Sequence, residues 1–382
     1  MLTLYKFELR KIISRKIVWI TGGVLLVGLV IWGIASAVLP QNREYSDSSL
    51  NGYAANRAEQ EAAEQISGRA IDQKLIDEMR PAYEDFIFNG NYKEALPYLD
   101  VYNFIGRTLG TQAGAEILVC DSEAFYEKLN AQLEANTPAG LTESISFAEP
   151  IVYHGYFDGW RQIADKMKLI TCMEIMFIAI CLSTVFTVEH TRKTDQVILC
   201  TRLGKKKLYA AKTLAGLTVG VGFTLLLSLL MFGIIAFLYG FDGYDTILQF
   251  VLLRPFNLTV GQAALILVGL SFAGAALISI FTMMLSEVTK NSIATIGIIT
   301  GVLLVTMFIM EMPANLKLLS EIWYLLPSNL VSLNGAFRYS MFHVGGSPLA
   351  AYQYAPIVYL VLAVIFALIG KLTYNRYQIN GR

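Results

Sequence analysis

The chain has 382 residues, of which 55% are hydrophobic and 16% are charged. This composition disfavours a water-soluble protein, because soluble domains carry about 25% charged residues. The 30 basic residues balance the 30 acidic residues, so the overall charge predicts no nucleic-acid partner. Six stretches nearly free of charge indicate a polytopic membrane protein instead, since about 20 apolar residues in a helix cross a hydrocarbon core of ~30 Å.

The residues before the first span, 1–16, are predicted to form a cytoplasmic amphipathic helix. Lys6, Arg10 and Lys11 occupy much of one side, and an apolar face occupies the other. Such a helix lies along the inner membrane surface; the alternative is a plain basic flank of the span. The apolar face consists of Leu2, Tyr5, Leu9, Ile12 and Ile13.

The six apolar stretches predict six transmembrane helices. They lack the alternation of apolar and polar residues that is typical of a membrane β-barrel. In lipid, a helix satisfies every backbone hydrogen bond within one isolated segment. The predicted fold is therefore an all-α polytopic membrane protein. Its spans are residues 17–39, 169–188, 213–241, 258–285, 292–310 and 354–370.

A cleavable signal peptide is the alternative for residues 17–39. Basic residues precede this stretch, and Ala35-Ser36-Ala37 resembles a cleavage site. The apolar run before that site has about eighteen residues, whereas a signal peptide usually has about 7–15. A retained first span is therefore favoured.

The long polar segment 40–165 is predicted to be an α-rich extracellular domain between the first two spans. Ile66, Ile71 and Leu75 belong to a pattern of mostly helical spacing, and 123–133 is typical of another helix. The segment carries nine Lys or Arg residues against twenty-one Asp or Glu residues. This acidic excess fits either attraction of a cationic substrate or an ordinary soluble surface, and we favour the ordinary surface.

Basic residues predict the orientation, because cytoplasmic connections of membrane proteins are enriched in Lys and Arg. Segments 1–16, 189–212, Lys290 and the tail 371–382 together hold 16 basic residues. Both termini are therefore predicted to be cytoplasmic. The shorter connections on the opposite side hold only Arg254, Lys317 and Arg338.

The segment before the last span, 311–353, is apolar but interrupted. One apolar piece stops at Pro327, and a second piece, 330–342, ends shortly before Pro348. Each piece is too short to cross the membrane. The pattern predicts broken or re-entrant helices that cap the extracellular end of the bundle.

The motifs that carry enzyme chemistry are missing from the sequence. No Gly-x-x-x-x-Gly-Lys-Ser/Thr phosphate loop is present, so the chain is not a P-loop ATPase by itself. The three histidines lie far apart in sequence and outside the predicted spans, which predicts neither a metal site nor a catalytic residue. Ser271 in the fourth span therefore has no histidine in any span to serve an intramembrane serine protease.

Glu174 is the one ionisable residue inside a predicted span. Such residues commonly line a pathway for substrate or ions, so Glu174 is a candidate for the translocation path. The alternative is that its side chain reaches the nearby membrane interface, because the apolar stretch begins only about five residues earlier, or roughly 7–8 Å away.

The loop 189–212 combines an acid at the membrane exit, basic residues, a short apolar stretch and a second basic cluster. This pattern predicts a surface that docks on a cytoplasmic partner, and a basic patch for anionic lipid is the alternative. The loop resembles that of permease subunits of type-2 ABC exporters, although Lys193, Gln196 and Leu203 depart from the family pattern. The residues that match it by position are Glu189, Thr194, Ile198, Leu199, Thr201, Lys206 and Lys212.

The amphipathic helix, the six spans, the external domain and the broken segment also resemble that family. The resemblance implies a permease that forms the substrate path with a second permease chain, identical or paralogous, in contact with membrane lipid. It also implies that a separate cytoplasmic ABC ATPase binds ATP and Mg²⁺ and docks on 189–212, so this chain itself needs no cofactor and is not an enzyme. The implied location is a bacterial plasma membrane. The alternative from another class is a membrane receptor or sensor whose external domain binds a ligand and whose cytoplasmic loop docks a signalling protein.

Overall fold

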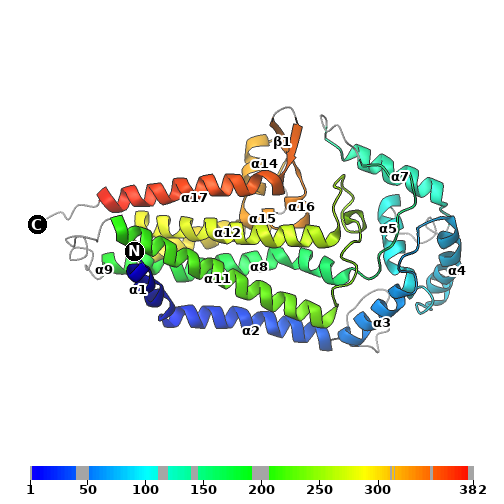
Figure 1. Ribbon diagram of the computed structural model, residues 1–382, viewed down its shortest axis with the longest axis horizontal. Helices are drawn as coiled ribbons and strands as arrows, with labels where there is room; N and C mark the ends of the chain where they lie inside the picture. The colour runs from blue at the N-terminus through cyan, green and yellow to red at the C-terminus, as the bar shows by residue number, and fades with distance from the viewer. Residues whose placement is uncertain are drawn as a thin grey trace, which may run out of the picture.

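The computed structural model describes residues 2–39, 51–110, 119–138, 145–191, 206–309, 312–313, 315–344 and 347–376. Long helices lie side by side in a bundle, and a group of shorter helices packs against one end of it (Figure 1). The first helix, α1 (Leu2–Ile13), and the end of the last helix, α17 (Ala351–Arg376), lie together at the other end (Figure 1). The molecule is therefore elongated, with the short helices at one end and α1 at the other (Figure 1).

Five helices in the described parts of the chain are long and apolar enough to cross a membrane. A further apolar helix, α13 (Ser292–Phe308), has 17 residues, which is the lower end of the range of about 17–25 for a span. The structure thus supports a helical polytopic membrane protein, and the sixth span stays a prediction. The long helices are α2 (Lys16–Val38), α8 (Asp158–Leu182) continued by α9 (Thr184–Thr191), α11 (Lys206–Leu238), α12 (Val260–Thr289) and α17.

Helix α12 lies at the centre of the bundle, where it packs against α8, α11, α13 and α17. Small residues allow the close approach of α11. A β-carbon at Gly216 would collide with the Met283 sulfur, and one at Gly220 would collide with the Ser279 hydroxyl. Small residues one turn apart are typical of helix contacts in lipid, where dispersion forces replace the hydrophobic effect.

The group of short helices comes from the segment predicted to be an α-rich domain. Helix α4 begins after Asp72, whose carboxylate accepts a hydrogen bond from the backbone N–H of Leu75 at 2.9 Å, as an N-cap does. Gly90 and Gly110 end α4 and α5 in the left-handed conformation, with φ of 71° and 72°. The helices are α3 (Gly52–Glu64), α4 (Gln73–Asn89), η1 (Leu96–Tyr98), α5 (Leu99–Leu109) and α7 (Ser122–Ala135).

Aromatic packing joins these helices to the bundle. Phe104 of α5 stacks on Phe250 of the short helix η2 (Leu248–Phe250), with ring centroids 4.3 Å apart. Arg107 donates a hydrogen bond to the carbonyl of Val251 at 3.0 Å. The short helices therefore rest on the connection between α11 and α12 as well as on the chain that leads into α8.

The segment before the last helix differs from its prediction. Helices α14 (Lys317–Tyr324), α15 (Pro327–Leu330) and α16 (Leu333–Ala336) are short, as expected for broken helices. The end of the predicted second piece instead forms β1 (Tyr339–Val344), which pairs antiparallel with β2 (Ser347–Ala350). The helical prediction for 339–342 is wrong, because β1 pairs with β2 and a run of aromatic and β-branched residues suits a paired strand as well as a short helix.

Candidate functional site

Four charged side chains meet at the end of the bundle that carries α1. The Lys11 ammonium lies 2.8 Å from Glu189 Oε1 and 3.6 Å from Glu8 Oε2. Glu189 also pairs with Lys212 of α11. We call these four residues the ion cluster; its two acids and two bases balance each other and join α1, α9 and α11.

The ion cluster is mostly closed to solvent. The Lys212 side chain is 0% exposed, and its ammonium lies 4.9 Å from the centre of the Phe186 ring. Glu8 and Glu189 are also buried, whereas Lys11 is about one-third exposed. A buried ammonium is stable only with a counter-charge, so Glu189 is what allows Lys212 to stay inside the protein.

Apolar and polar contacts hold α1 beside the ion cluster. Ile12 is fully buried, and Tyr5 and Leu9 are partly buried against the core. The Tyr5 hydroxyl is hydrogen-bonded to Thr218 Oγ1 of α11 at 2.9 Å. The other two residues of the predicted apolar face, Leu2 and Ile13, are 68% and 39% exposed. Helix α1 is therefore docked on the bundle along one side, and the role of its exposed apolar residues at a membrane interface stays a prediction.

Three of the seven residues predicted to couple to an ATPase lie in the described parts of the chain. Glu189 and Lys212 meet in the ion cluster, although the sequence separates them by the whole loop. Lys206 is the first residue of α11. The remaining four lie outside the described residues: Thr194, Ile198, Leu199 and Thr201.

Sequence reasoning missed the part that α1 plays in the ion cluster. Glu8 and Lys11 belong to a helix that was predicted to face lipid on one side and water on the other. The available signal was that Glu8 is the only acid among residues 1–16. An acid in an otherwise basic helix is a candidate for a specific ion pair, and here it is buried beside Lys11.

Glu174 lies deeper than its sequence position indicated. Helix α8 begins at Asp158, eleven residues before the predicted span, so Glu174 is near the middle of the Asp158–Glu189 helix. Its side chain is fully buried, and Ser271 Oγ of α12 donates a hydrogen bond to Glu174 Oε2 at 2.9 Å. Thr171 Oγ1 lies 3.4 Å from the same Ser271 oxygen. The side chain of Glu174 therefore faces α12 inside the bundle, and its place relative to the membrane interface stays a prediction.

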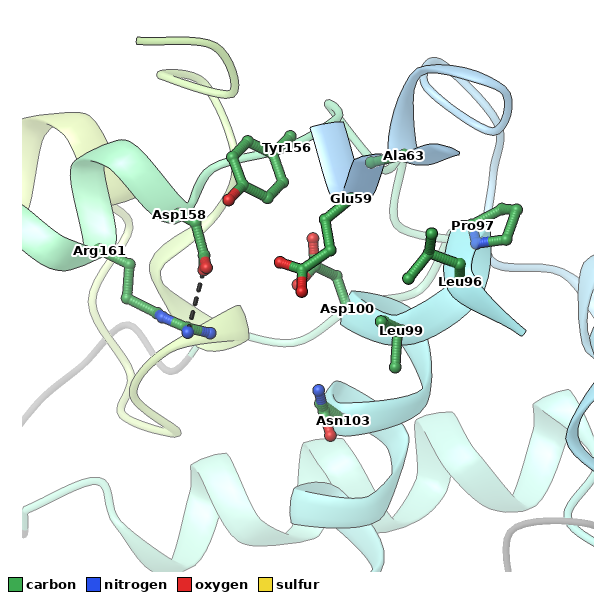
Figure 2. Close-up of a pocket in the computed structure, with 10 residues that line it drawn as sticks. All are labelled: Glu59, Ala63, Leu96, Pro97, Leu99, Asp100, Asn103, Tyr156, Asp158 and Arg161. Carbon is green, nitrogen blue, oxygen red and sulfur yellow. Dashed lines mark ion pairs between the residues drawn. The ribbon is translucent and has the colours of Figure 1, made fainter. Parts of the chain in front are cut away.

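An acidic cavity of about 290 Å³ lies where the short helices meet the start of α8 (Figure 2). Glu59 of α3, Asp100 of α5 and Asp158 of α8 line it together with one cation, Arg161. Arg161 pairs with Asp158 at 3.0 Å, and the carboxylates of Glu59 and Asp100 point toward each other (Figure 2). This cavity gathers part of the acidic excess at the junction between the two parts of the molecule.

Asp100 is a carboxylate of this cavity whose acidity is strongly altered. Loss of solvent and, to a smaller extent, the neighbouring Asp158 charge raise its pKa to about 7, against the opposing hydrogen bond that Tyr153 donates at 2.6 Å. The ordinary pKa of an aspartate is about 3.9. The folded protein therefore favours the protonated form of Asp100 over the pH interval between these values.

The stability of the short-helix group is expected to depend on pH through Asp100. Because the pKa is higher in the folded state, the stabilising contribution is complete below about pH 4 and is lost as the pH rises to about 7. In Asp100→Asn, stability is expected no longer to fall as the pH rises. In Asp77→Asn, which changes an exposed carboxylate of α4, the fall in stability is expected to remain. Thermal unfolding of each full-length variant between pH 5 and pH 8 measures the difference, and equal pH dependence in both variants would contradict the assignment.

Comparison with known protein families matches residues 2–368 to the family described as ABC-2 family transporter protein. The chain belongs to the ABC-2 transporter family. No curated protein and no solved structure matches it. The match confirms the resemblance that the 189–212 loop and the order of segments indicated.

Membership of the ABC-2 family shows which component of a transporter this chain is. The permease is the transmembrane component of an ABC transporter and is not itself the ATPase. Membership also implies association with an ABC ATPase subunit. The match extends from α1 into α17 and therefore includes the ion cluster, Glu174 and the acidic cavity.

Proposed function

We propose that this chain is the permease subunit of an ATP-driven ABC exporter, in which two permease chains form the substrate path and each binds a separate cytoplasmic ATPase. ATP and Mg²⁺ would be bound by the ATPase subunits. The end of the bundle that carries α1 would face the cytoplasm, and the short-helix group would be extracellular. Membership of the ABC-2 family supports transport over the alternative of a membrane receptor.

The ion cluster is the observation that best supports coupling through the 189–212 loop. Glu189 and Lys212 lie at the two ends of this loop and pair with each other. The Lys11 ammonium of α1 lies 2.8 Å from Glu189 Oε1 of the same pair. A force applied by an ATPase to residues between Glu189 and Lys212 would therefore reach α1, α9 and α11 together.

The substrate path is proposed to include Glu174. A buried carboxyl that accepts a hydrogen bond from the neighbouring helix is a typical polar point inside a membrane bundle. A change in the contact between α8 and α12 would alter the surroundings of this carboxyl. Ser271 would then be a partner that positions Glu174 in one state of the transport cycle.

The coupling proposal is tested by shortening the apolar side chains of the loop. A buried leucine at an interface contributes on the order of 1–2 kcal/mol, or about five- to thirtyfold in binding, whereas one exposed lysine contributes less than about 1 kcal/mol. Ile198→Ala and Leu199→Ala are therefore expected to weaken ATPase association more than Lys205→Ala does. Co-purification of the ATPase at matched permease expression measures the order.

The same three variants distinguish protein docking from lipid binding. A basic lipid patch predicts the reverse order, because anionic lipid contributes ~1 kcal/mol for each basic residue and little for one leucine. Unchanged association and transport in the Ile198→Ala, Leu199→Ala double variant would rule out docking through these residues.

A further inference from the structure

A second cavity, of about 520 Å³, lies between helices of the bundle, is partly open to its surface and belongs to none of the sites described above. Helices α8, α12, α13 and α17 form its walls, and the chain from α14 to α15 covers it. This volume is within the range of about 300–1,000 Å³ that is typical of ligand sites. Its lining includes Ile175, Phe281, Ile299, Leu303, Leu326 and Tyr359.

The lining offers almost nothing to a polar ligand. Ser328 and Tyr359 are the two residues of the lining that carry a hydroxyl group. Ser328 Oγ donates to Thr306 Oγ1 at 2.9 Å, and the Tyr359 hydroxyl donates to the carbonyl of Leu325 at 2.6 Å. Both donors are thus used inside the protein, and an apolar cavity of this kind does not hold water stably.

The cavity is bordered by side chains on the outside of the bundle. Val302 of α13 and Ile322 of α14 line it while remaining 47% and 52% exposed. In a membrane-spanning bundle these apolar side chains face hydrocarbon, so the cavity has a lateral border with the lipid phase. Lipid chains are the surrounding solvent at this border, which makes them the most concentrated apolar ligand.

We propose that this cavity binds one hydrocarbon chain of a membrane lipid. A helix of a second copy is a poor occupant, because a helix about 10–12 Å in diameter would fill such a volume within about one turn. A single acyl chain is narrow and flexible and can follow the cavity. It would also provide the dispersion contacts that the apolar lining lacks when the cavity is empty.

An acyl chain in this cavity would lie close to Glu174 in the interior of the bundle. Pro327 in its cover packs against α12 at Gly274, where a β-carbon would lie 3.1 Å from Pro327 Cβ and 3.9 Å from Glu174 Oε1. Ile175 in the cavity wall is the next residue after Glu174. A bound acyl chain would therefore support the chain from α14 to α15 at Pro327, which packs close to Glu174.

The test uses the full-length permease in lipid nanodiscs that contain phosphatidylcholine with a photoactivatable diazirine in one acyl chain. Mass spectrometry after illumination maps the adducts along α13. Adducts at Ile299 and Leu303, which are each 4% exposed, are expected to exceed those at Ile298 and Leu304, which are 45% and 53% exposed. Ordinary surrounding lipid predicts the opposite order and would overturn the proposal.

A matched pair of variants tests occupancy. Ile299→Trp fills the cavity and is expected to abolish the adduct at Leu303, whereas Ile298→Trp on the lipid-facing side of the same helix is expected to retain it. If Ile299→Trp does not give a monodisperse protein, Val302→Trp at the border serves instead, because that side chain is already half exposed. Retention of the adduct in the filled variant would overturn the proposal.

A cysteine at position 302 distinguishes lipid from a second copy. A Val302→Cys variant that forms a disulfide between two copies and loses the lipid adduct at Leu303 would assign the cavity to a protein contact and overturn the proposal. An adduct that persists while the introduced thiol stays unpaired is the expected result. Both readouts are independent of transport and of ATPase binding.

Discussion

Lys212→Met is expected to destabilise the permease more than any other change of a single lysine in or beside the ion cluster. It leaves Glu189 buried with Lys11 as its remaining counter-charge. Removing one partner of a buried ion pair costs about 3–5 kcal/mol, and we expect the lower end because Lys11 stays. Lys11→Met is expected to cost less, since Lys11 is partly exposed, and Lys207→Met at an exposed position of α11 is expected to cost less than about 1 kcal/mol. Thermal unfolding in detergent measures the order.

The double variant Glu189→Gln, Lys212→Met separates stability from coupling. Replacing both members of a buried pair by neutral side chains of similar size is often close to neutral for stability. We therefore expect the double variant to regain most of the stability lost in Lys212→Met. We expect transport in this variant to remain uncoupled from ATP. Recovery of both properties would mean that the ion cluster only stabilises the fold.

Arg338→Met is expected to loosen the hairpin of β1 and β2 and the chain from α14 to α15, which lie beside the bundle (Figure 1). Arg338 donates a hydrogen bond to Glu321 Oε1 at 2.6 Å, and its guanidinium lies 4.1 Å from the centre of the Tyr324 ring. Without it, the buried Glu321 keeps the hydrogen bond from Tyr354 at 2.9 Å but loses this counter-charge. We expect a cost of about 3–5 kcal/mol, as for other broken buried pairs.

Hydrogen exchange of the backbone is the suitable measurement for Arg338→Met, because the expected loss is local. Exchange in α14, β1 and β2 is expected to increase strongly, while exchange in α8 and α12 changes little. Lys317→Met is the matched control, since Lys317 is an exposed cation at the start of α14. Equal exchange in the two variants would contradict the role given to the Arg338 and Glu321 pair.

The organisation of the bundle could be predicted from sequence because lipid restricts the possible backbone. Long apolar runs in a membrane must be helical, and the helices found there include the predicted stretches almost completely. Their starts were less predictable. Helix α8 begins at Asp158 because its first turns belong to the junction with the short helices, where Asp158 and Arg161 form an ion pair. Hydropathy detects the apolar part of a helix and not its polar extension.

The candidate sites required the structure because they depend on contacts between distant residues. Glu189 and Lys212 could be selected from their loop, but Lys11 is 178 residues away from Glu189 and no periodicity relates the two. The hairpin after α16 was missed because its apolar residues suit both a strand and a short helix. The apolar cavity depends on how side chains from separate helices fill space, and spacing along one helix contains no information about that.

Photocrosslinking from position 199 tests the central proposal most directly. A photoreactive amino acid replaces Leu199 in the full-length chain, a second variant carries it at Ser48, and both are illuminated in the native membrane. The account predicts an adduct with a P-loop ATPase from position 199, with a yield that changes on addition of ATP and Mg²⁺, and none from position 48. An ATPase adduct from position 48, or adducts from position 199 that contain only lipid, would contradict it.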